Sequence, residues 1–167
     1  GQPQDNISPA APRTADGRFT NLAGDIGHGP LTVRLPFMLR RFGTYFRDAE
    51  GSPARVANDG VFLRKNAGQG VPTVTWIGHA SVLVQMDNVS FLTDPTWSNR
   101  PSPVPLIGPS RFVPPGLAME DLPPIDFVLI SHNHFDHLDL PTLRLLAKRN
   151  PATVFYVPLG NAALLQQ

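Results

Sequence analysis

Four side chains able to bind a metal ion lie within the six residues from 132 to 137. They are His132, His134, Asp136 and His137, and they follow the short apolar run 127–130. That run is typical of a buried strand. Alternate residues of an extended chain share a face, so His132 and His134 can point the same way. A turn after them would bring Asp136 and His137 to the same cavity.

Imidazole and carboxylate groups are ligands that suit zinc, iron or manganese. The alternative is a group of surface histidines on a loop. We favour a metal site, because four such groups at this spacing after a buried strand rarely have another explanation. The sequence has no cysteine, which excludes thiolate ligands and disulfides.

The pattern His-x-His-x-Asp-His after an apolar strand resembles the signature of the metallo-β-lactamase superfamily. Three other segments narrow the resemblance: Thr-Trp-Ile-Gly-His-Ala at 75–80, Phe-Leu-Thr-Asp-Pro at 91–95 and Leu-Pro-Pro-Ile-Asp at 122–126. Together they are similar to the branch that contains N-acyl-phosphatidylethanolamine-hydrolysing phospholipase D and its bacterial relatives. The resemblance covers about residues 72–160 and is more specific for the superfamily than for a lipid substrate.

The resemblance implies a role for each of these residues. His132 and His134 would bind one metal, and Asp136 and His137 would bind the second, with Asp136 also the catalytic carboxylate. Two zinc ions per complete site are expected, with iron or manganese as other candidates. Asp94 would lie beneath the site and hold the histidine loop by hydrogen bonds. The alternative for Asp94 is a simple turn-forming residue.

The resemblance also implies a metal-dependent hydrolase, a zinc phosphodiesterase of phospholipase D type acting on a phospholipid-like small molecule. Two neighbouring ions would lower the pKa of a shared water, and the bridging hydroxide would attack phosphorus. One alternative is a lactonase or other ester hydrolase on the same metal site. The other is a non-catalytic fragment that assembles with a second chain.

In the resembled family the fold is a four-layer αββα sandwich, whose second half supplies a bridging aspartate and two further histidines. This sequence has no histidine after His137, and its one later acidic residue is Asp139. We therefore expect a mixed α/β chain that forms the N-terminal half of the sandwich. The second half would come from the same polypeptide or another chain. Residues 1–167 alone would be inactive, because catalytic zinc generally has three protein ligands and a water.

Three runs of alternating apolar residues precede the metal motif and predict strands. They cover residues 74–76, 81–86 and 89–93, and the Asp-Asn pair at 87–88 predicts a tight turn between the last two. His79 follows a glycine at the end of the first strand. The family motif does not make it a ligand, so we expect a structural histidine.

The elements after the motif are predicted from capping and breaking residues. Asp139 is expected as the N-cap of a helix with Pro141 in its first turn, and Asn-Pro at 150–151 ends that helix. Residues 153–157 predict another strand, and a further helix begins at Asn161.

Residues 95–124 form a long proline-rich segment, which inside a compact domain is usually functional. Trp97 and Phe112 give it apolar surface, while Arg100 and Arg111 could contact an anionic group. These four residues are therefore candidates for substrate contacts. The alternative is a surface loop held in place by its own packing.

Three regions are predicted along the chain. Residues 1–30 are expected to be a flexible arm, 31–70 a helical and loop extension, and 71–167 the first half of the hydrolase domain. A helix over about 36–47, with Pro36 in its first turn, is apolar and rich in arginine. It would pack on its own domain, which we favour, or contact a membrane surface peripherally.

Net charge and composition exclude few further classes of function. The formal net charge of +1 gives no case for nucleic acid. No apolar run is long enough to span a membrane, and no signal peptide is visible. The compartment is left open.

Overall fold

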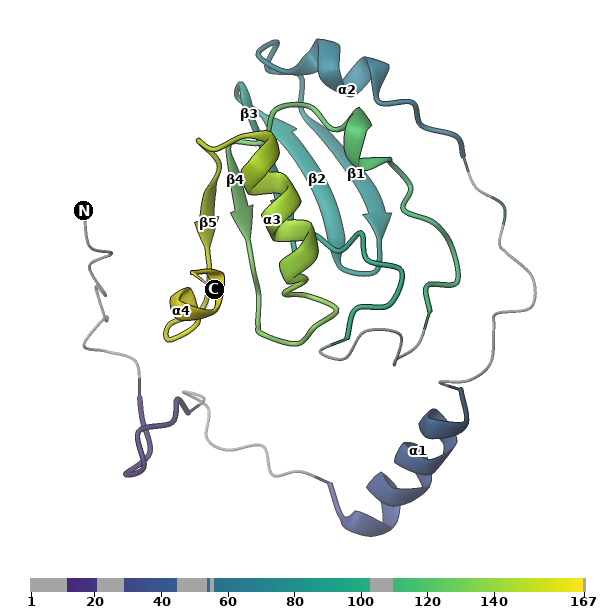
Figure 1. Ribbon diagram of the computed structural model, residues 1–167, viewed down its shortest axis with the longest axis vertical. Coiled ribbons are helices and arrows are strands. Elements are labelled where there is room, and N and C mark those ends of the chain that lie inside the picture. Colours follow the sequence, from purple (N-terminus) through teal and green to yellow (C-terminus); the bar gives the residue numbers. More distant parts are fainter. Residues whose placement is uncertain (1–11, 21–28, 45–53, 55, 103–109, 167) are drawn as a thin grey trace. The chain divides into compact units, whose positions relative to one another are not determined.

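The computed structural model describes residues 12–20, 29–44, 54, 56–102 and 110–166, of which 41–44 are described for their backbone only (Figure 1). The chain divides into two compact units, Gly1–Gly43 and Thr44–Gln167. The metal motif belongs to the second unit. Among the described residues, no helix has the length and apolar character needed to cross a membrane.

Local structure in the first unit differs in detail from the prediction. Helix α1 (Leu31–Thr44) begins well before residue 36, because the carbonyl of Pro30 accepts the N–H groups of Val33 at 3.0 Å and Arg34 at 3.1 Å. Pro36 therefore lies inside the helix rather than in its first turn. Side chains 31–40 are exposed. Both placements of this helix, on its own domain or on a membrane, stay predictions.

Part of the predicted flexible arm has local structure. Arg13 and Phe19 form an antiparallel bridge, and the Arg13 guanidinium lies 4.0 Å from the centroid of the Phe19 ring. Residues 1–11 and 21–28 of the arm, and 45–47 of the predicted helix, lie outside the described residues.

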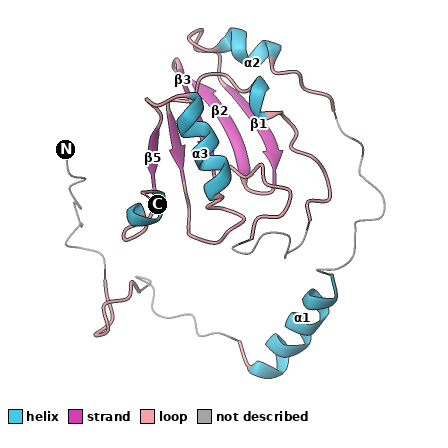
Figure 2. Cartoon of the chain, viewed as in Figure 1, coloured by secondary structure: helices cyan, strands magenta, loops and turns pink. Residues whose placement is uncertain are grey.

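The second unit is built on one mixed five-stranded sheet (Figures 1 and 2). Its strands, in spatial as well as sequence order, are β1 (Thr73–Gly78), β2 (Ser81–Met86), β3 (Val89–Thr93), β4 (Phe127–Leu129) and β5 (Val154–Tyr156). β1, β2 and β3 are antiparallel, whereas β4 and β5 run parallel to β3. The mixed α/β class and the predicted strands are thus confirmed.

The hairpin between β2 and β3 has the predicted turn. Asp87 and Asn88 have φ angles of 48° and 65°, the left-handed conformation that a two-residue type I′ turn requires. Asn and Asp adopt this conformation more readily than other non-glycine residues. The turn therefore fixes the register of β2 against β3.

Helices and loops cover one face of the sheet. The helices of this unit are α2 (Val61–Asn66), α3 (Leu140–Arg149) and α4 (Ala162–Leu165), with a 3₁₀ turn at Met119–Asp121. In Figure 1, α3 lies across the sheet. Its Leu143 and Leu146 belong to one buried cluster with Leu83, Leu92 and Val128 of the central strands. This packing places the loop before α3, which carries the metal motif, at one end of the sheet.

Asp139 occupies the predicted N-cap position of α3 but does not cap the helix with its side chain. Its carboxylate instead accepts hydrogen bonds from the backbone N–H of Ser98 at 3.0 Å, the Ser98 hydroxyl at 2.7 Å and the Thr142 hydroxyl at 2.6 Å. The prediction was wrong about this side chain, because a tertiary partner competes for the carboxylate. Asp139 thereby ties the proline-rich segment to the start of α3.

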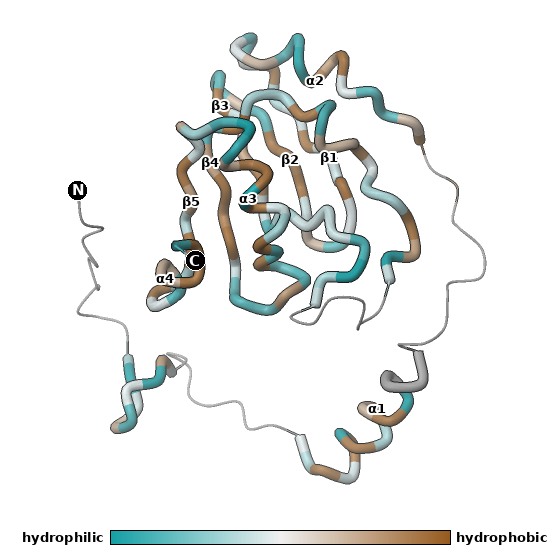
Figure 3. Tube along the Cα trace, viewed as in Figure 1, coloured by the Kyte–Doolittle hydropathy of each residue, from teal (hydrophilic) through white to brown (hydrophobic). Residues whose placement is uncertain are grey.

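The opposite face of the sheet is apolar and open. Strand pairing aligns two rows across it: Val74, Val84, Phe91, Phe127 and Val154, and then Trp76, Val82, Thr93, Leu129 and Tyr156. The Trp76 side chain is 69% exposed. Trp76, Val84 and Phe91 all lie on this face. Figure 3 shows the apolar segments along these strands.

Two adjacent residues of β2, Leu83 and Val84, test which face of the sheet is buried. Leu83→Ala should lower the free energy of unfolding by about 2–5 kcal/mol, because Leu83 is 0% exposed and its removal leaves a cavity. Val84→Ala on the half-exposed face should have a clearly smaller effect. Urea denaturation of both variants measures the difference. Equal losses would contradict the assignment of the buried face.

Candidate metal site

The metal motif continues directly from β4. The Ile130 N–H donates to the carbonyl of Tyr156 at 2.9 Å, so regular pairing extends one residue past the strand. The chain then turns, and the N–H groups of His137 and Leu138 donate to the carbonyl of His134 at 3.0 and 2.7 Å. This turn brings Asp136 and His137 back beside the first two histidines, as the sequence predicted.

The first two histidines present ring nitrogens to one another. His132 Nε2 lies 3.0 Å from His134 Nδ1. Two nitrogens bound to one tetrahedral zinc at about 2.0–2.1 Å would lie roughly 3.3 Å apart. The pair therefore fits a shared ion with only a small adjustment.

Asp136 and His137 form a second pair next to the first. His137 Nε2 lies 3.8 Å from Asp136 Oδ2, and the centroids of the His132 and His137 rings are 4.0 Å apart. All four predicted ligands therefore lie in one cluster of nitrogen and oxygen donors. Their chemistry and spacing fit the metal that the motif implies.

Asp94 lies beneath this cluster and holds it together. Its Oδ1 accepts the Ser131 N–H at 2.7 Å, and its Oδ2 accepts the Ser131 hydroxyl at 2.7 Å and His137 Nδ1–H at 2.8 Å. An ionised carboxylate can only accept hydrogen bonds, so the proton in the bond between His137 and Asp94 is assigned to His137 Nδ1. That tautomer leaves His137 Nε2, on the side of Asp136, free to bind a metal.

The environment of Asp94 favours its ionised form. Burial raises the pKa of the Asp94 carboxyl, but hydrogen bonds from His137 and Ser131 outweigh burial and hold the pKa below its ordinary value. Asp94 also has a left-handed backbone with φ 39°. Its N–H donates to the Leu129 carbonyl at 2.9 Å, which joins the end of β3 to the end of β4.

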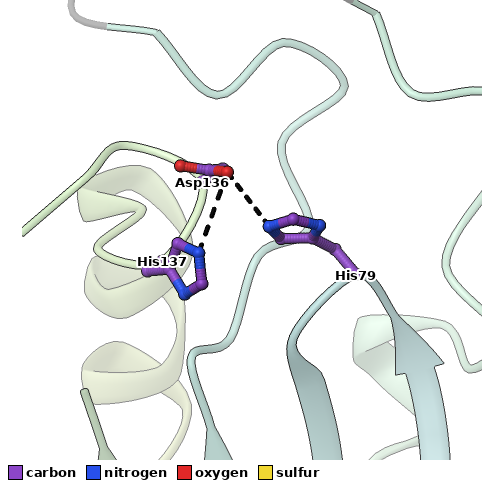
Figure 4. A group of neighbouring side chains, drawn as sticks. All are labelled: His79, Asp136 and His137. Atoms are coloured by element: carbon purple, nitrogen blue, oxygen red, sulfur yellow. Dashed lines mark ion pairs between the residues drawn. The ribbon is translucent and has the colours of Figure 1, made fainter. Parts of the chain in front are cut away.

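The structure adds one residue that sequence reasoning set aside. His79 Nε2 lies 3.0 Å from Asp136 Oδ2, and His79, Asp136 and His137 each offer a ligand atom within 4.8 Å of the other two (Figure 4). The signal available in the sequence was the position of His79 directly after a strand. Sequence alone could not show that the β1–β2 turn lies beside the histidine loop.

Two of the four candidate substrate-contact residues, Trp97 and Arg111, make hydrogen bonds within the proline-rich segment. Trp97 Nε1–H donates to the Leu117 carbonyl at 3.0 Å. The Arg111 guanidinium donates to the carbonyls of Thr96 at 2.7 Å and Val113 at 3.3 Å. Burial lowers the pKa of Arg111, and the charge of Asp139 partly offsets this.

The other two candidates are at the surface of the segment. Phe112 is 70% exposed, and Arg100 is half-buried. Trp97 also lines a groove of about 530 Å³ with residues 56–59, 114–116 and 118–120. Trp97 and Arg111 thus make internal contacts and Phe112 is exposed, and contact of all four candidates with substrate stays a prediction.

Comparison with known proteins agrees with the motif. Residues 90–167 match the model of a family described as a beta-lactamase superfamily domain. These residues, slightly less than half of the chain, are similar to that superfamily. The match includes β3, Asp94 and all four residues of the metal motif.

Two curated relatives are phospholipid or metal-dependent hydrolases by name. N-acyl-phosphatidylethanolamine-hydrolyzing phospholipase D 1 of Caenorhabditis elegans is 46% identical over 86 residues, which are 52% of this chain and 24% of that protein. A metal-dependent hydrolase of Anaeromyxobacter sp. is 42% identical over 72 residues, 43% of this chain and 23% of that protein. The chain thus spans about a quarter of the length of these relatives.

A solved structure gives a further comparison. The isothiocyanate hydrolase from Delia radicum gut bacteria is 27% identical to this chain. The superposition covers 56% of this chain and 36% of that chain, with a TM-score of 0.44.

Substituting Asp94 tests whether it holds the loop. Asp94→Asn should lower the free energy of unfolding by about 1–3 kcal/mol, because an amide oxygen cannot replace a carboxylate that accepts three hydrogen bonds. Asp87→Asn, in the exposed β2–β3 turn, is the matched control and should change stability little. Chemical denaturation at neutral pH measures both.

The effect of Asp94→Asn should depend on pH. A carboxylate with a lowered folded pKa adds stability that is complete above its unfolded pKa and is lost as pH falls through the folded pKa. The difference between parent and variant should therefore shrink in acid. If the difference in unfolding free energy between parent and variant stays constant as pH falls through the folded pKa of Asp94, the charged role of Asp94 is contradicted.

Proposed function

We propose that this chain provides metal ligands of a metal-dependent hydrolase. The observation that carries the proposal is the convergence of two ligand pairs, His132 with His134 at 3.0 Å and Asp136 with His137 at 3.8 Å. The relatives whose names describe metal-dependent or phospholipid hydrolysis support it.

The proposed cofactor is zinc, with two ions per complete site. When bound, zinc supplies a Lewis acid that lowers the pKa of water and offsets negative charge on a phosphate oxygen. His132 and His134 would hold one ion, and Asp136 and His137 the other. Asp94 keeps His137 in the tautomer that can bind. Iron and manganese fit the same donor types.

The proposed reaction is hydrolysis of a phosphodiester in a phospholipid-like molecule. The similarity to a phospholipase D that acts on N-acyl-phosphatidylethanolamine by name supports this substrate class. The groove beside Trp97, with Val56, Pro114 and Met119 in its lining, offers apolar surface of the kind an acyl chain could use. The Asp136 side chain is 43% exposed, and His134 is also exposed, so substrate can reach both proposed ligands.

Metal binding is the first test. His134→Ala removes one of two donors to one proposed ion, so zinc affinity should fall at least about tenfold. Asn133→Ala changes the neighbouring exposed residue, whose amide contacts Asn161, and is the matched control. Zinc competition with a fluorescent chelator measures both affinities. Unchanged binding by His134→Ala would contradict the ligand assignment.

Turnover is the second test. The zinc-loaded protein is assayed with a soluble phosphodiester, a phospholipid and a lactone, both as residues 1–167 and as the longest natural polypeptide that contains them. We expect phosphodiester cleavage from the longer form and none from residues 1–167, because four ligands give each ion two protein contacts. Preferred lactone cleavage would favour the ester hydrolase. No turnover with metal bound would favour a non-catalytic fragment.

A further inference from the structure

His79 reaches the metal motif from a different part of the chain. It lies in the turn between β1 and β2, and its Nε2 is 3.0 Å from Asp136 Oδ2 (Figure 4). The His79 and His137 rings meet edge to face, with centroids 5.0 Å apart. His79 therefore contacts both members of the second ligand pair.

The backbone at His79 has a positive φ, a conformation that is uncommon among non-glycine residues. Its φ of 51° is in the left-handed region, where a non-glycine residue costs on the order of 1–3 kcal/mol. Trp76 Nε1–H donates to the His79 carbonyl at 2.9 Å, and the β1–β2 register shifts between Trp76 and Gly78. A Cβ at Gly78 would lie 2.7 Å from a guanidinium nitrogen of Arg111. The Trp76 indole thus restrains the backbone from which the imidazole extends.

Stability alone does not account for this arrangement. The side chains of His79 and Asp136 are 53% and 43% exposed, and an exposed ion pair contributes only about 0–1 kcal/mol. That contribution does not exceed the expected strain at His79. Strained residues of this kind are commonly found at functional sites, where their direction is part of the mechanism.

Asp136 needs a group that fixes its carboxylate. Its backbone is held because the Thr96 hydroxyl donates to its carbonyl at 2.8 Å. Asp94 orients the His137 ring from below, but the carboxylate of Asp136 lies on the open side of the site. The described neighbour at hydrogen-bonding distance from that carboxylate is His79.

We propose that His79 is a positioning residue of the metal site: its Nε2–H donates to Asp136 Oδ2 and holds that carboxylate in the orientation that binds metal with His137. This inference rests on the proposed metal-dependent function. Partners that orient metal ligands typically contribute 10–100-fold to metal affinity. His79 would thus do for Asp136 what Asp94 does for His137.

Two substitutions separate positioning from other roles. In His79→Asn the side chain is too short to reach Asp136, while asparagine accepts the left-handed backbone well. Metal affinity should fall about 10–100-fold with no loss of thermal stability. In His79→Gln an amide N–H can reach the same oxygen, so affinity should recover to near the parent value. Asp87→Asn, at another left-handed position, is the control for the backbone.

The measurements are zinc affinity by competition and the visible absorption spectrum of the cobalt-loaded protein, which reports the ligand geometry. A His79→Asn protein with the parent affinity and spectrum would overturn this inference and leave the proposed function standing. Equal loss in both variants would overturn positioning and show that the imidazole itself binds metal. If the parent binds neither zinc nor cobalt, the proposed function fails, and this inference with it.

Discussion

The histidine loop depends on the buried carboxylate of Asp94. Three hydrogen bonds, two from Ser131 and one from His137, end on its two oxygens at 2.7–2.8 Å. Its own N–H joins β3 to β4. One residue therefore connects the ends of β3 and β4, the tautomer of a proposed ligand and the path of the loop. Burial raises the pKa of the Asp94 carboxyl, but its hydrogen bonds outweigh burial and hold that pKa below its ordinary value, which favours the ionised form.

The sheet positions the site because its two faces are unequal. One face packs Leu83, Leu92 and Val128 under α3 and fixes the end of β4 from which the metal motif departs. The other presents Trp76 and Tyr156, both more than half exposed. An open apolar face of this kind is a surface suited to a further protein layer. The proposed site and this face belong to the same sheet, so a layer that covers the face would also stiffen the base of the site.

The turn at His79 shows how a strained backbone can serve a site. Trp76 Nε1–H donates to the His79 carbonyl, the Arg111 guanidinium lies close to Gly78, and His79 Nε2 lies 3.0 Å from Asp136 Oδ2. Arg111 was expected to contact an anionic group, yet two of its donors hold carbonyls of the proline-rich segment. Its guanidinium thus holds the proline-rich segment close to Gly78, the residue before His79. Side chains thus connect the proline-rich segment, β1 and the histidine loop, through Trp76 to His79, His79 to Asp136 and Thr96 to Asp136.

The sequence by itself determined the strands, the hairpin turn at 87–88, the end of α3 at Asn150 and the proposed ligands, because periodicity, turn chemistry and motif spacing are local properties. It also indicated Asp94. Only the tertiary structure decided that Asp139 bonds Ser98 instead of capping α3, and that His79 lies 3.0 Å from Asp136. Each of these contacts joins residues 41 or 57 positions apart in the chain. Such contacts depend on how elements pack, which no local pattern encodes.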